Sequence, residues 1–290
     1  MSGINTNRTN IDLPTDIAAE IIQKTQEDSA VMGLARQIAL PGRGLTIPVI
    51  TGDPEAGWVD ETGAKPISNP GLSKKIMQAY KLAVIVPFSD EFARDLASLY
   101  DALVQRLPKA LALKFDNTVF GGSNAPGNNF DTFASVTGQS VDSSVYGALV
   151  AADTDISTHG GILNGFALSP QAKGVLLGAL DNNDRPLFIN NVSEGAVPML
   201  LGAPAKYSKA AYIDGDSNTP DVLGIAGDWT QALYGTVEGV KIDMSNQATL
   251  TINNEAVNLW ERNMFAVRAE IEVGFRADTT VFNKLTRTHS

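Results

Sequence analysis

The chain has 290 residues, and its 22 Lys and Arg against 32 Asp and Glu give a formal net charge of −10. Cysteine is absent and only two histidines occur, His159 and His289, which excludes thiolate chemistry and Cys-type metal sites and argues against a histidine metal cluster or a Ser-His-Asp triad. Phosphate repels an acidic chain, so tight nucleic-acid binding is not expected. No apolar run reaches the roughly 20 residues that span a bilayer, so we expect no membrane partner.

The first part of the chain predicts an arm, a helix and a strand. Met1 to Pro14 is polar and reads as an extended arm. From Asp16 the apolar residues share one helical face, and Asp16 itself suits a helix cap. After Gly44, Leu45 to Ile50 is a short apolar strand candidate.

A long segment without helical or strand period follows, from Thr51 to Tyr80. A loop longer than about 15 residues is unusual in a compact domain unless it has a function. Its first half is acidic and its second half basic, which favours packing against another copy of the protein; a mobile surface loop is the open alternative. The residues predicted to make contacts between subunits are Trp58, Asp60, Glu61, Lys65, Lys74 and Lys75.

The next segment predicts a strand and a long helix. Lys81 to Phe88 is a clean apolar strand. Ser89 then caps a helix with Asp90 and Glu91 in its first turn, as the helix dipole favours. Leucines at steps of three and four mark one buried face up to Phe120, and Pro108 should bend or interrupt the helix.

The middle of the chain, Ser123 to Asn246, alternates short helices and strands and suggests a mixed α/β unit inserted into another domain. Helices are expected at Ser143–Ala152 and Pro170–Leu180, and strands at Gly165–Leu168, Ala211–Ile213, Leu223–Ala226 and Val240–Asp243. From Met264, apolar and charged residues alternate up to Arg276, which predicts a long half-exposed strand. Thr280 to Leu285 then predicts a return strand.

Signals of an active site are absent from the sequence. It lacks phosphate-binding glycine loops and nucleophile motifs. Asp214 to Asn218 resembles the start of a calcium loop, but Thr219 and Ile225 stand where that loop needs Gly and Glu, so a polar turn is the better interpretation. A soluble α/β enzyme that uses the Asp214–Asp221 loop with a divalent metal stays the more distant alternative. We predict that the protein is not an enzyme and has no cofactor or metal.

The order of these elements resembles the major capsid proteins of tailed bacteriophages, which have the Hong Kong 97 fold. The stretches that carry the resemblance are Ala56–Glu61, Lys65–Ser68, Lys81–Ala83, Ser89–Glu91, Phe120–Gly122, Leu187–Phe188, Leu200–Pro204, Gly227–Trp229, Val240–Asp243 and Arg268–Phe282. The resemblance implies an α+β fold. Its parts would be an N-terminal arm (1–43), a strand, extended loop and return strand (44–88), the spine helix of a peripheral domain (89–123), an inserted axial domain (124–245) and C-terminal strands that complete the peripheral domain (246–290).

The resemblance also implies a function. The chain would self-assemble as pentamers and hexamers into an icosahedral shell around double-stranded DNA, bound without sequence specificity. Implied partners are the portal, a separate scaffolding protein and decoration proteins. The protein would be part of the virion capsid and assemble in the host cytoplasm. An encapsulin-like cellular compartment is the alternative within the same fold.

Two further roles follow from the resemblance alone. Lys74, Asn263 and Glu270 match the lysine, asparagine and glutamate that join subunits by an isopeptide bond in some family members. The alternative is that Lys74 pairs with an acidic neighbour and that Glu270 makes cross-strand ion pairs. Pro108 is the predicted hinge at which the spine helix bends when the shell fills with DNA.

Overall fold

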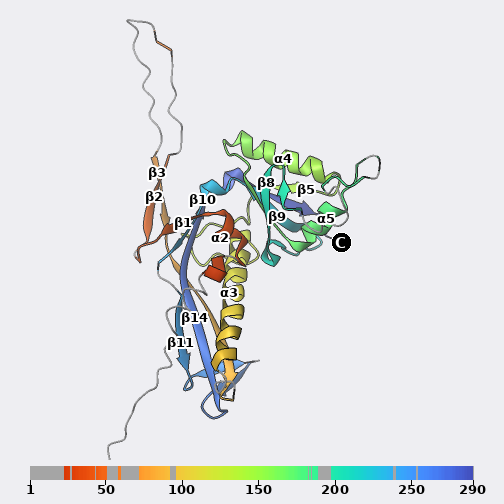
Figure 1. The fold of residues 1–290 in the computed structure, drawn as a ribbon. Coiled ribbons are helices and arrows are strands. Elements are labelled where there is room, and N and C mark those ends of the chain that lie inside the picture. Colours follow the sequence, from red (N-terminus) through yellow and green to blue (C-terminus); the bar gives the residue numbers. More distant parts are fainter. Residues whose placement is uncertain are drawn as a thin grey trace, which may run out of the picture.

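The computed structural model describes residues 23–26, 28–42, 44–50, 58–59, 72–91, 96–181, 183, 185–188, 197–237, 240–252 and 254–289. These residues form two limbs set at an angle to each other (Figure 1). In the long limb, strand β14 (Met264–Ala277) runs beside helix α3 (Leu96–Phe120). Helix α4 (Val145–Thr158) lies on the compact limb. None of the described helices is long and apolar enough to cross a membrane.

Strand β14 organises the sheet of the long limb. Strand β4 (Tyr80–Ser89) pairs with it antiparallel along one edge. Strands β10 (Ala232–Thr236) and β11 (Lys241–Ser245) pair antiparallel with successive parts of the other edge. Strand β1 (Arg36–Ala39) adds to β10 in parallel. The predicted strands at Lys81–Phe88 and from Met264 are therefore confirmed.

The two faces of β14 differ as its alternating sequence predicts. Val267, Ala269 and Ile271 are buried and belong to one core cluster with leucines of α3. Charged residues occupy the opposite face, where Arg268 is exposed. The sheet of the long limb thus has an apolar face packed against α3 and a charged face towards solvent.

Helix α3 begins later than predicted and runs on through its proline. Ser89 does not cap it, because Ser89 still pairs with Met264 at the end of β4, and Asp90 and Glu91 form a turn. The backbone N–H of Asp90 donates to the carbonyl of Asn263 at 2.9 Å, which prolongs the strand pairing. Pro108 lies buried inside the helix and does not interrupt it. The leucine face is confirmed for its described members, Leu103, Leu107 and Leu111, which are buried.

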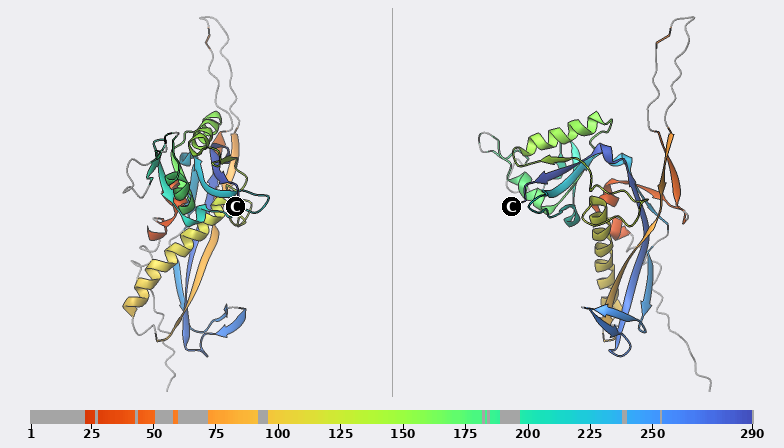
Figure 2. Two further views of the ribbon diagram at one scale, coloured as in Figure 1. Left: turned by 90° about the vertical axis from the view of Figure 1, so that its right-hand side faces the viewer. Right: turned by 180° about the vertical axis from the view of Figure 1, so that it is seen from behind.

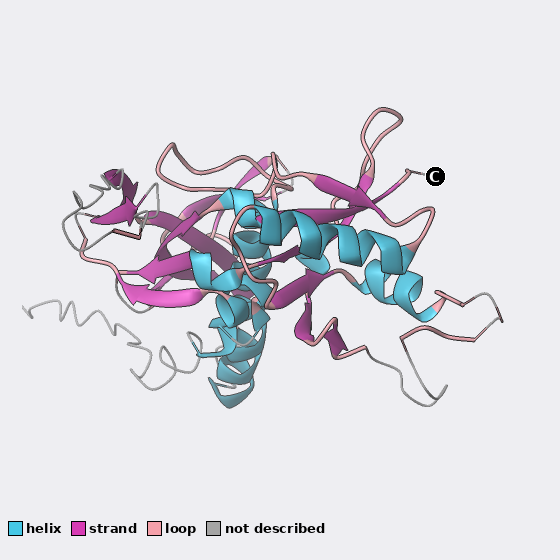
Figure 3. Cartoon of the chain, turned by 90° about the horizontal axis from the view of Figure 1, so that it is seen from above, coloured by secondary structure: helices cyan, strands magenta, loops and turns pink. Residues whose placement is uncertain are grey.

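The compact limb contains a six-stranded sheet, with helices α4 and α5 (Pro170–Leu177) packed on it (Figure 3). Its strand order is β5 (Gly138–Ser140), β15 (Phe282–Arg287), β9 (Asp221–Gly227), β6 (Gly165–Leu168), β8 (Ala203–Tyr207) and β7 (Met199–Leu200). Ser144 and Ser169 cap the two helices through their side chains, and Pro170 occupies the first turn of α5. The predicted helices and the strand at Gly165–Leu168 are confirmed.

Strand β15 corrects a predicted boundary. The segment after β14 does not return along β14; it turns through the 3-10 helix η4 (Thr279–Val281) and enters the sheet of the compact limb between β5 and β9. The residues 246–290 therefore do not all complete the long sheet. Phe282 explains the change, because its ring lies 4.5 Å from that of Phe133 and 5.3 Å from that of Trp229 in the compact core.

Three other strands also depart from the predicted division into parts, because a strand pattern does not identify its partner strand. Strands β10 and β11 fall within 124–245 but pair with β14, and β1 falls within 1–43 but joins the long sheet. The expected strand at Ala211–Ile213 is instead the 3-10 helix η2 (Lys209–Ala211), followed by an isolated bridge between Ile213 and Val222.

A two-stranded hairpin projects from the long sheet (Figure 2). Strand β2 (Leu45–Ile50), which was predicted, pairs antiparallel with β3 (Leu72–Met77), which lies inside the segment predicted to lack strand structure. The sequence of β3 places two lysines between apolar residues without period-two alternation, so its pattern did not identify it. The remaining elements are α2 (Ala30–Leu34), η3 (Trp229–Gln231), β12 (Thr249–Ile252) and β13 (Glu255–Asn258).

One buried carboxylate, Asp116 of α3, joins three separate segments. It accepts hydrogen bonds from the Ser29 hydroxyl at 2.5 Å, from the Ala30 and Val31 backbone N–H groups at 2.9 and 3.3 Å, and from the Ser208 hydroxyl at 3.0 Å. Ser29 caps α2 and Ser208 caps η2. Asp116 therefore connects the N-terminal helix, the long helix and the compact limb. Burial raises the pKa of Asp116 to about 6.

Replacing Asp116 by alanine should destabilise the chain, because these buried donors lose their acceptor. We expect the free energy of unfolding to fall by roughly 3 kcal/mol, measured by urea titration under non-assembling conditions. Asp153→Ala on α4 is the control and should change stability by less than about 0.5 kcal/mol. Equal losses in the two variants would contradict the role of Asp116.

Asp116 should also make stability depend on pH. Its pKa of about 6 in the folded state lies above the ordinary aspartate value of 3.8. Between these values the folded state binds more protons than the unfolded state, so this group's contribution to stability declines as pH rises from about 4 to about 6, by roughly 3 kcal/mol in all. Asp116→Asn should lack this contribution. Parallel pH profiles of unfolding free energy in the two proteins would show that the carboxyl does not titrate in this window.

Candidate functional site

The base of the β2–β3 hairpin is fixed to the end of β14. The Lys75 ammonium donates to the Ala277 carbonyl at 2.9 Å. The Arg276 guanidinium donates to the Ile76 carbonyl at 2.8 Å and to the Asp131 carboxylate at 2.7 Å, and its side chain is only 11% exposed. Charge-assisted bonds of this kind are strong when partly buried. The direction of the hairpin relative to the long limb is therefore set by the chain itself.

Of the predicted contact residues that the structure describes, Lys74 and Trp58 are exposed, whereas Lys75 is hydrogen-bonded within its own chain. Lys74 is exposed on β3, whereas Lys75 beside it is occupied at the hairpin base. Trp58 is 106% exposed, the highest value among the large apolar side chains described. A fully exposed tryptophan is unfavourable in water and typical of an interface residue. The other three predicted residues, Asp60, Glu61 and Lys65, lie outside the described residues.

The charged face of the long sheet forms a row of cross-strand ion pairs. The Lys81 ammonium lies 2.7 Å from the Glu270 carboxylate and 3.5 Å from that of Glu272. The Arg268 guanidinium lies 2.6 Å from Asp243. The hydrogen bond with Lys81 lowers the pKa of Glu270 and raises that of Lys81. Glu270 thus makes the cross-strand ion pair that the sequence analysis gave as the alternative to a role in the cross-link.

The three residues of the predicted cross-link do not meet within one chain. Asn263 and Glu270 are seven positions apart in sequence, and β14 is extended between them, which separates them by roughly 20 Å. Asn263 has a φ of 50° in the turn before β14, a left-handed conformation that asparagine tolerates well. A bond between Lys74 and Asn263 near Glu270 would need neighbouring copies of the chain, so the cross-link stays a prediction.

Large apolar side chains are exposed at both far ends of the molecule. Trp260, in the turn that leads into β14 at the end of the long limb, is 70% exposed. On the compact limb, four apolar side chains between positions 180 and 201 are 42% to 58% exposed: Leu180, Leu187, Met199 and Leu201. Such groups of exposed apolar residues are found at protein–protein interfaces.

A polar cluster on the compact limb was not predicted. His289 lies 2.7 Å from the Asp221 carboxylate and 3.8 Å from that of Asp214. The Tyr212 hydroxyl lies 3.2 Å from both carboxylates, and burial, with the hydrogen bonds to them, raises the pKa of Tyr212 to about 12. The hydrogen bond to Asp221 raises the pKa of His289. The pairing of β15 with β9 sets Arg287 opposite Asp221, and no local signal in the sequence shows that this register brings His289 there.

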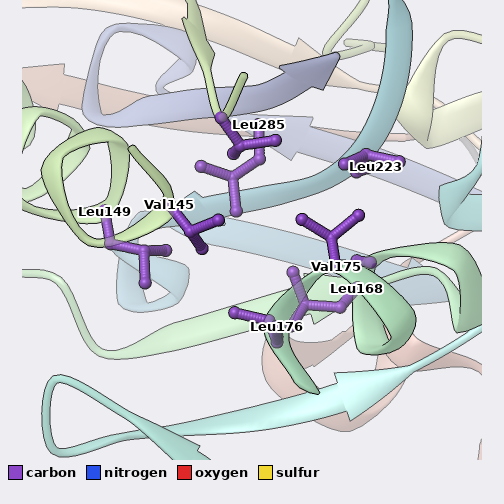
Figure 4. Close-up of a pocket in the computed structure, with 9 residues that line it drawn as sticks. Val145, Leu149, Leu168, Val175, Leu176, Leu223 and Leu285 are labelled. Atoms are coloured by element: carbon purple, nitrogen blue, oxygen red, sulfur yellow. The ribbon is translucent and has the colours of Figure 1, made fainter. Parts of the chain in front are cut away.

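The pocket between α4, α5 and the compact sheet is lined by aliphatic side chains alone. All the residues that line it are aliphatic, among them Val145, Leu149 and Leu176 (Figure 4). This gap lies between packed elements, and its lining side chains offer no polar group to a ligand.

Known proteins resemble this chain over almost its whole length. The model of the "Phage capsid family" matches residues 11–278. The "Probable major capsid protein gp17" of Mycobacterium phage L5 is 29% identical and covers 94% of this chain and 89% of its own length. The "Major capsid protein" of Staphylococcus phage 80alpha is 25% identical and covers 94% and 84%.

Solved structures show the same fold. A chain from Mycobacterium phage Ogopogo gives a TM-score of 0.71 at 16% identity, covering 90% of this chain and 92% of that one. A chain from Microbacterium phage Oxtober96 gives 0.69 at 23% identity, covering 90% and 91%. The family match spans most of the sequence, and the element order of this chain resembles the same proteins. The chain therefore belongs to the phage capsid family.

Proposed function

We propose that this chain is the major capsid protein of a tailed bacteriophage, and that many copies assemble into the shell of the virion. The observation that carries the proposal is the family match over residues 11–278, together with relatives named as major capsid proteins or probable ones. The encapsulin-like alternative is not favoured, because these relatives are phage proteins. A family of structural proteins also argues against the metal-dependent enzyme.

The proposed assignment of the Hong Kong 97 fold is supported by the two-limbed shape. In that assignment α3 is the spine helix of the peripheral domain, and the long sheet lies beside it. The compact limb is the axial domain, completed by β15 from the C-terminal end. The hairpin formed by β2 and β3 is the base of the extended loop, and the arm comprises the residues that precede β1.

The proposed contacts between subunits use the exposed surfaces. The hairpin carries Lys74 and leads towards Trp58, so it would lie on a neighbouring subunit; Asp60, Glu61 and Lys65 belong to the same proposed contact. The exposed leucines and Met199 on the compact limb would gather around the axes of pentamers and hexamers. The ion pairs of the long sheet are satisfied within the chain and add little to this contact.

The charge of the chain fits a container for DNA. A net charge of −10 means that a shell of many copies would repel packaged double-stranded DNA rather than grip it, so DNA would be held without sequence specificity. A portal, a separate scaffolding protein and decoration proteins are the further partners proposed. Assembly would take place in the host cytoplasm.

Pro108 is proposed as the point at which α3 bends during expansion of the shell. A proline in a helix removes one backbone donor, so the helix is easier to bend there. Pro108→Ala should restore that hydrogen bond and slow expansion of assembled shells, followed by time-resolved small-angle X-ray scattering. Expansion at the rate of the wild type would exclude Pro108 as the hinge.

The chain expressed alone should form closed shells, tubes or capsomer rings in the megadalton range. Negative-stain electron microscopy and size-exclusion light scattering measure this directly. If the chain alone is monomeric, co-expression with the products of neighbouring genes should produce shells, because a separate scaffold then nucleates them. A monomer under both conditions would contradict the proposed function.

A Trp58→Ala variant tests whether the hairpin side carries the assembly contact. Removing an interface tryptophan typically costs about 2 kcal/mol, so the critical concentration for assembly should rise roughly thirtyfold. Because Trp58 is fully exposed in the single chain, its unfolding free energy should stay within about 0.5 kcal/mol of the wild type. Unchanged assembly of this variant would remove Trp58 from the proposed contact.

A further inference from the structure

We propose that Asp214, Asp221 and His289 form a binding site for one divalent transition-metal ion of the zinc class. Each side chain offers one ligand atom, and the three atoms lie within 4.8 Å of one another. The site lies on the compact limb, away from the hairpin, and the proposal does not depend on the proposed function in assembly.

The distances between the ligand atoms suit a shared ion. His289 Nδ1 lies 2.7 Å from Asp221 Oδ1 and 3.8 Å from Asp214 Oδ1. Zinc binds nitrogen and oxygen ligands at about 2.0–2.2 Å, which places neighbouring ligand atoms roughly 3.0–3.5 Å apart. The observed distances lie on either side of this range. Small rotations of the exposed Asp214 side chain, which is 75% exposed, are enough to close the site.

The surroundings already hold the carboxylates in place. The Tyr212 hydroxyl contacts both Asp214 Oδ1 and Asp221 Oδ2 at 3.2 Å. The Gly215 backbone N–H donates to Asp221 Oδ1 at 2.8 Å. Groups that hydrogen-bond to metal ligands orient them and raise the affinity of the site. The ligands therefore need little ordering when an ion binds.

The charge of the cluster favours a cation. Among the described residues, His289 is the only group of basic type that forms an ion pair with Asp214 or Asp221. Asp216 adds a third carboxylate nearby, although its Oδ1 accepts bonds from Asn218 and Thr219 and is not a ligand. Even a protonated imidazole neutralises one of three negative charges, which leaves an excess that a divalent ion can balance.

The imidazole decides the class of metal. Calcium and magnesium take oxygen ligands, whereas zinc, cobalt and nickel bind imidazole together with carboxylate. Two carboxylates and one imidazole leave further positions for water. A bound ion would tie the residues that follow β15, at His289, to the first residue of β9, Asp221, and so fasten one end of this strand pair.

The histidine content provides a matched control, because His159 is the other histidine in the sequence. His159 lies 3.7 Å from the carboxylate of Asp155 on α4, and its side chain is 48% exposed. It therefore provides an exposed His–Asp pair outside the three-residue cluster. Zinc binding that requires His289 but not His159 would therefore depend on the geometry of the three-ligand cluster.

The full-length chain, stripped of metal with a chelator, is titrated with ZnCl2 by calorimetry and with CoCl2 by visible absorption. We expect one saturable site per chain, an affinity at least about tenfold lower in His289→Gln and in Asp214→Asn, and no change in His159→Gln. Circular dichroism confirms that each variant is folded. Equal binding by wild type and His289→Gln, absence of saturable binding, or Ca²⁺ binding as tight as that of Zn²⁺ would overturn the proposal. These titrations read out metal binding whether or not the chain forms shells.

Discussion

The angle between the two limbs depends on the joint around Asp116. A continuous core of buried apolar residues crosses this joint, from α2 through the end of α3 into the compact limb. Within that core a single carboxylate, 0% exposed, accepts hydrogen bonds from the start of α2 and from Ser208. A buried acceptor with this many donors has few alternative arrangements, because any movement leaves polar groups unpaired. The joint is therefore stiff, which is what a subunit that must fit many identical neighbours requires.

The path of the chain adds to this stiffness. The chain passes from the compact sheet to the long sheet between β9 and β10, and returns between β14 and β15. Both passages are short, and each is flanked by paired strands. The two passages lie beside each other, because the Asp278 N–H donates to the Gln231 carbonyl at 3.2 Å and the Asp228 N–H donates to the Val281 carbonyl at 3.1 Å. A rigid frame of this kind leaves the hairpin and the exposed ends as the parts that can adapt to a neighbour.

Patterns within single elements could be read from the sequence. The alternation from Met264 and the leucine spacing around Leu107 each indicate one buried face. The strand lies where it was expected, and the helix ends at Phe120 as expected although it begins later. Pairing between distant segments could not be read, because a strand pattern fits either sheet. The apolar residues of β15 suit the long sheet as well as the compact one, and the aromatic contacts of Phe282 decide the outcome.

Among the functional features, the family could be inferred from the sequence, whereas the roles of single residues depend on contacts between distant segments. The order of elements indicated the family, but not which residues serve the joint. Asp116 looks like an ordinary polar residue near the end of a helix, and its partners Ser29 and Ser208 lie 87 and 92 positions away. The meeting of His289 with Asp221 depends on the register of β15, which no local motif encodes. Lys75 and Lys74 are neighbours in sequence, yet only the structure shows that Lys75 is used within its own chain.

In the proposed assembly, a stiff two-limbed subunit presents its hairpin to the next copy in the shell. A symmetric cryo-electron-microscopy reconstruction of the assembled particles tests this most directly. We expect the hairpin of each subunit to lie on a neighbouring subunit, with Trp58 buried there and the Asp116 joint unchanged from the single chain. Hairpins that contact only their own subunit, or limbs that meet at a different angle with Asp116 released from Ser29 and Ser208, would contradict it.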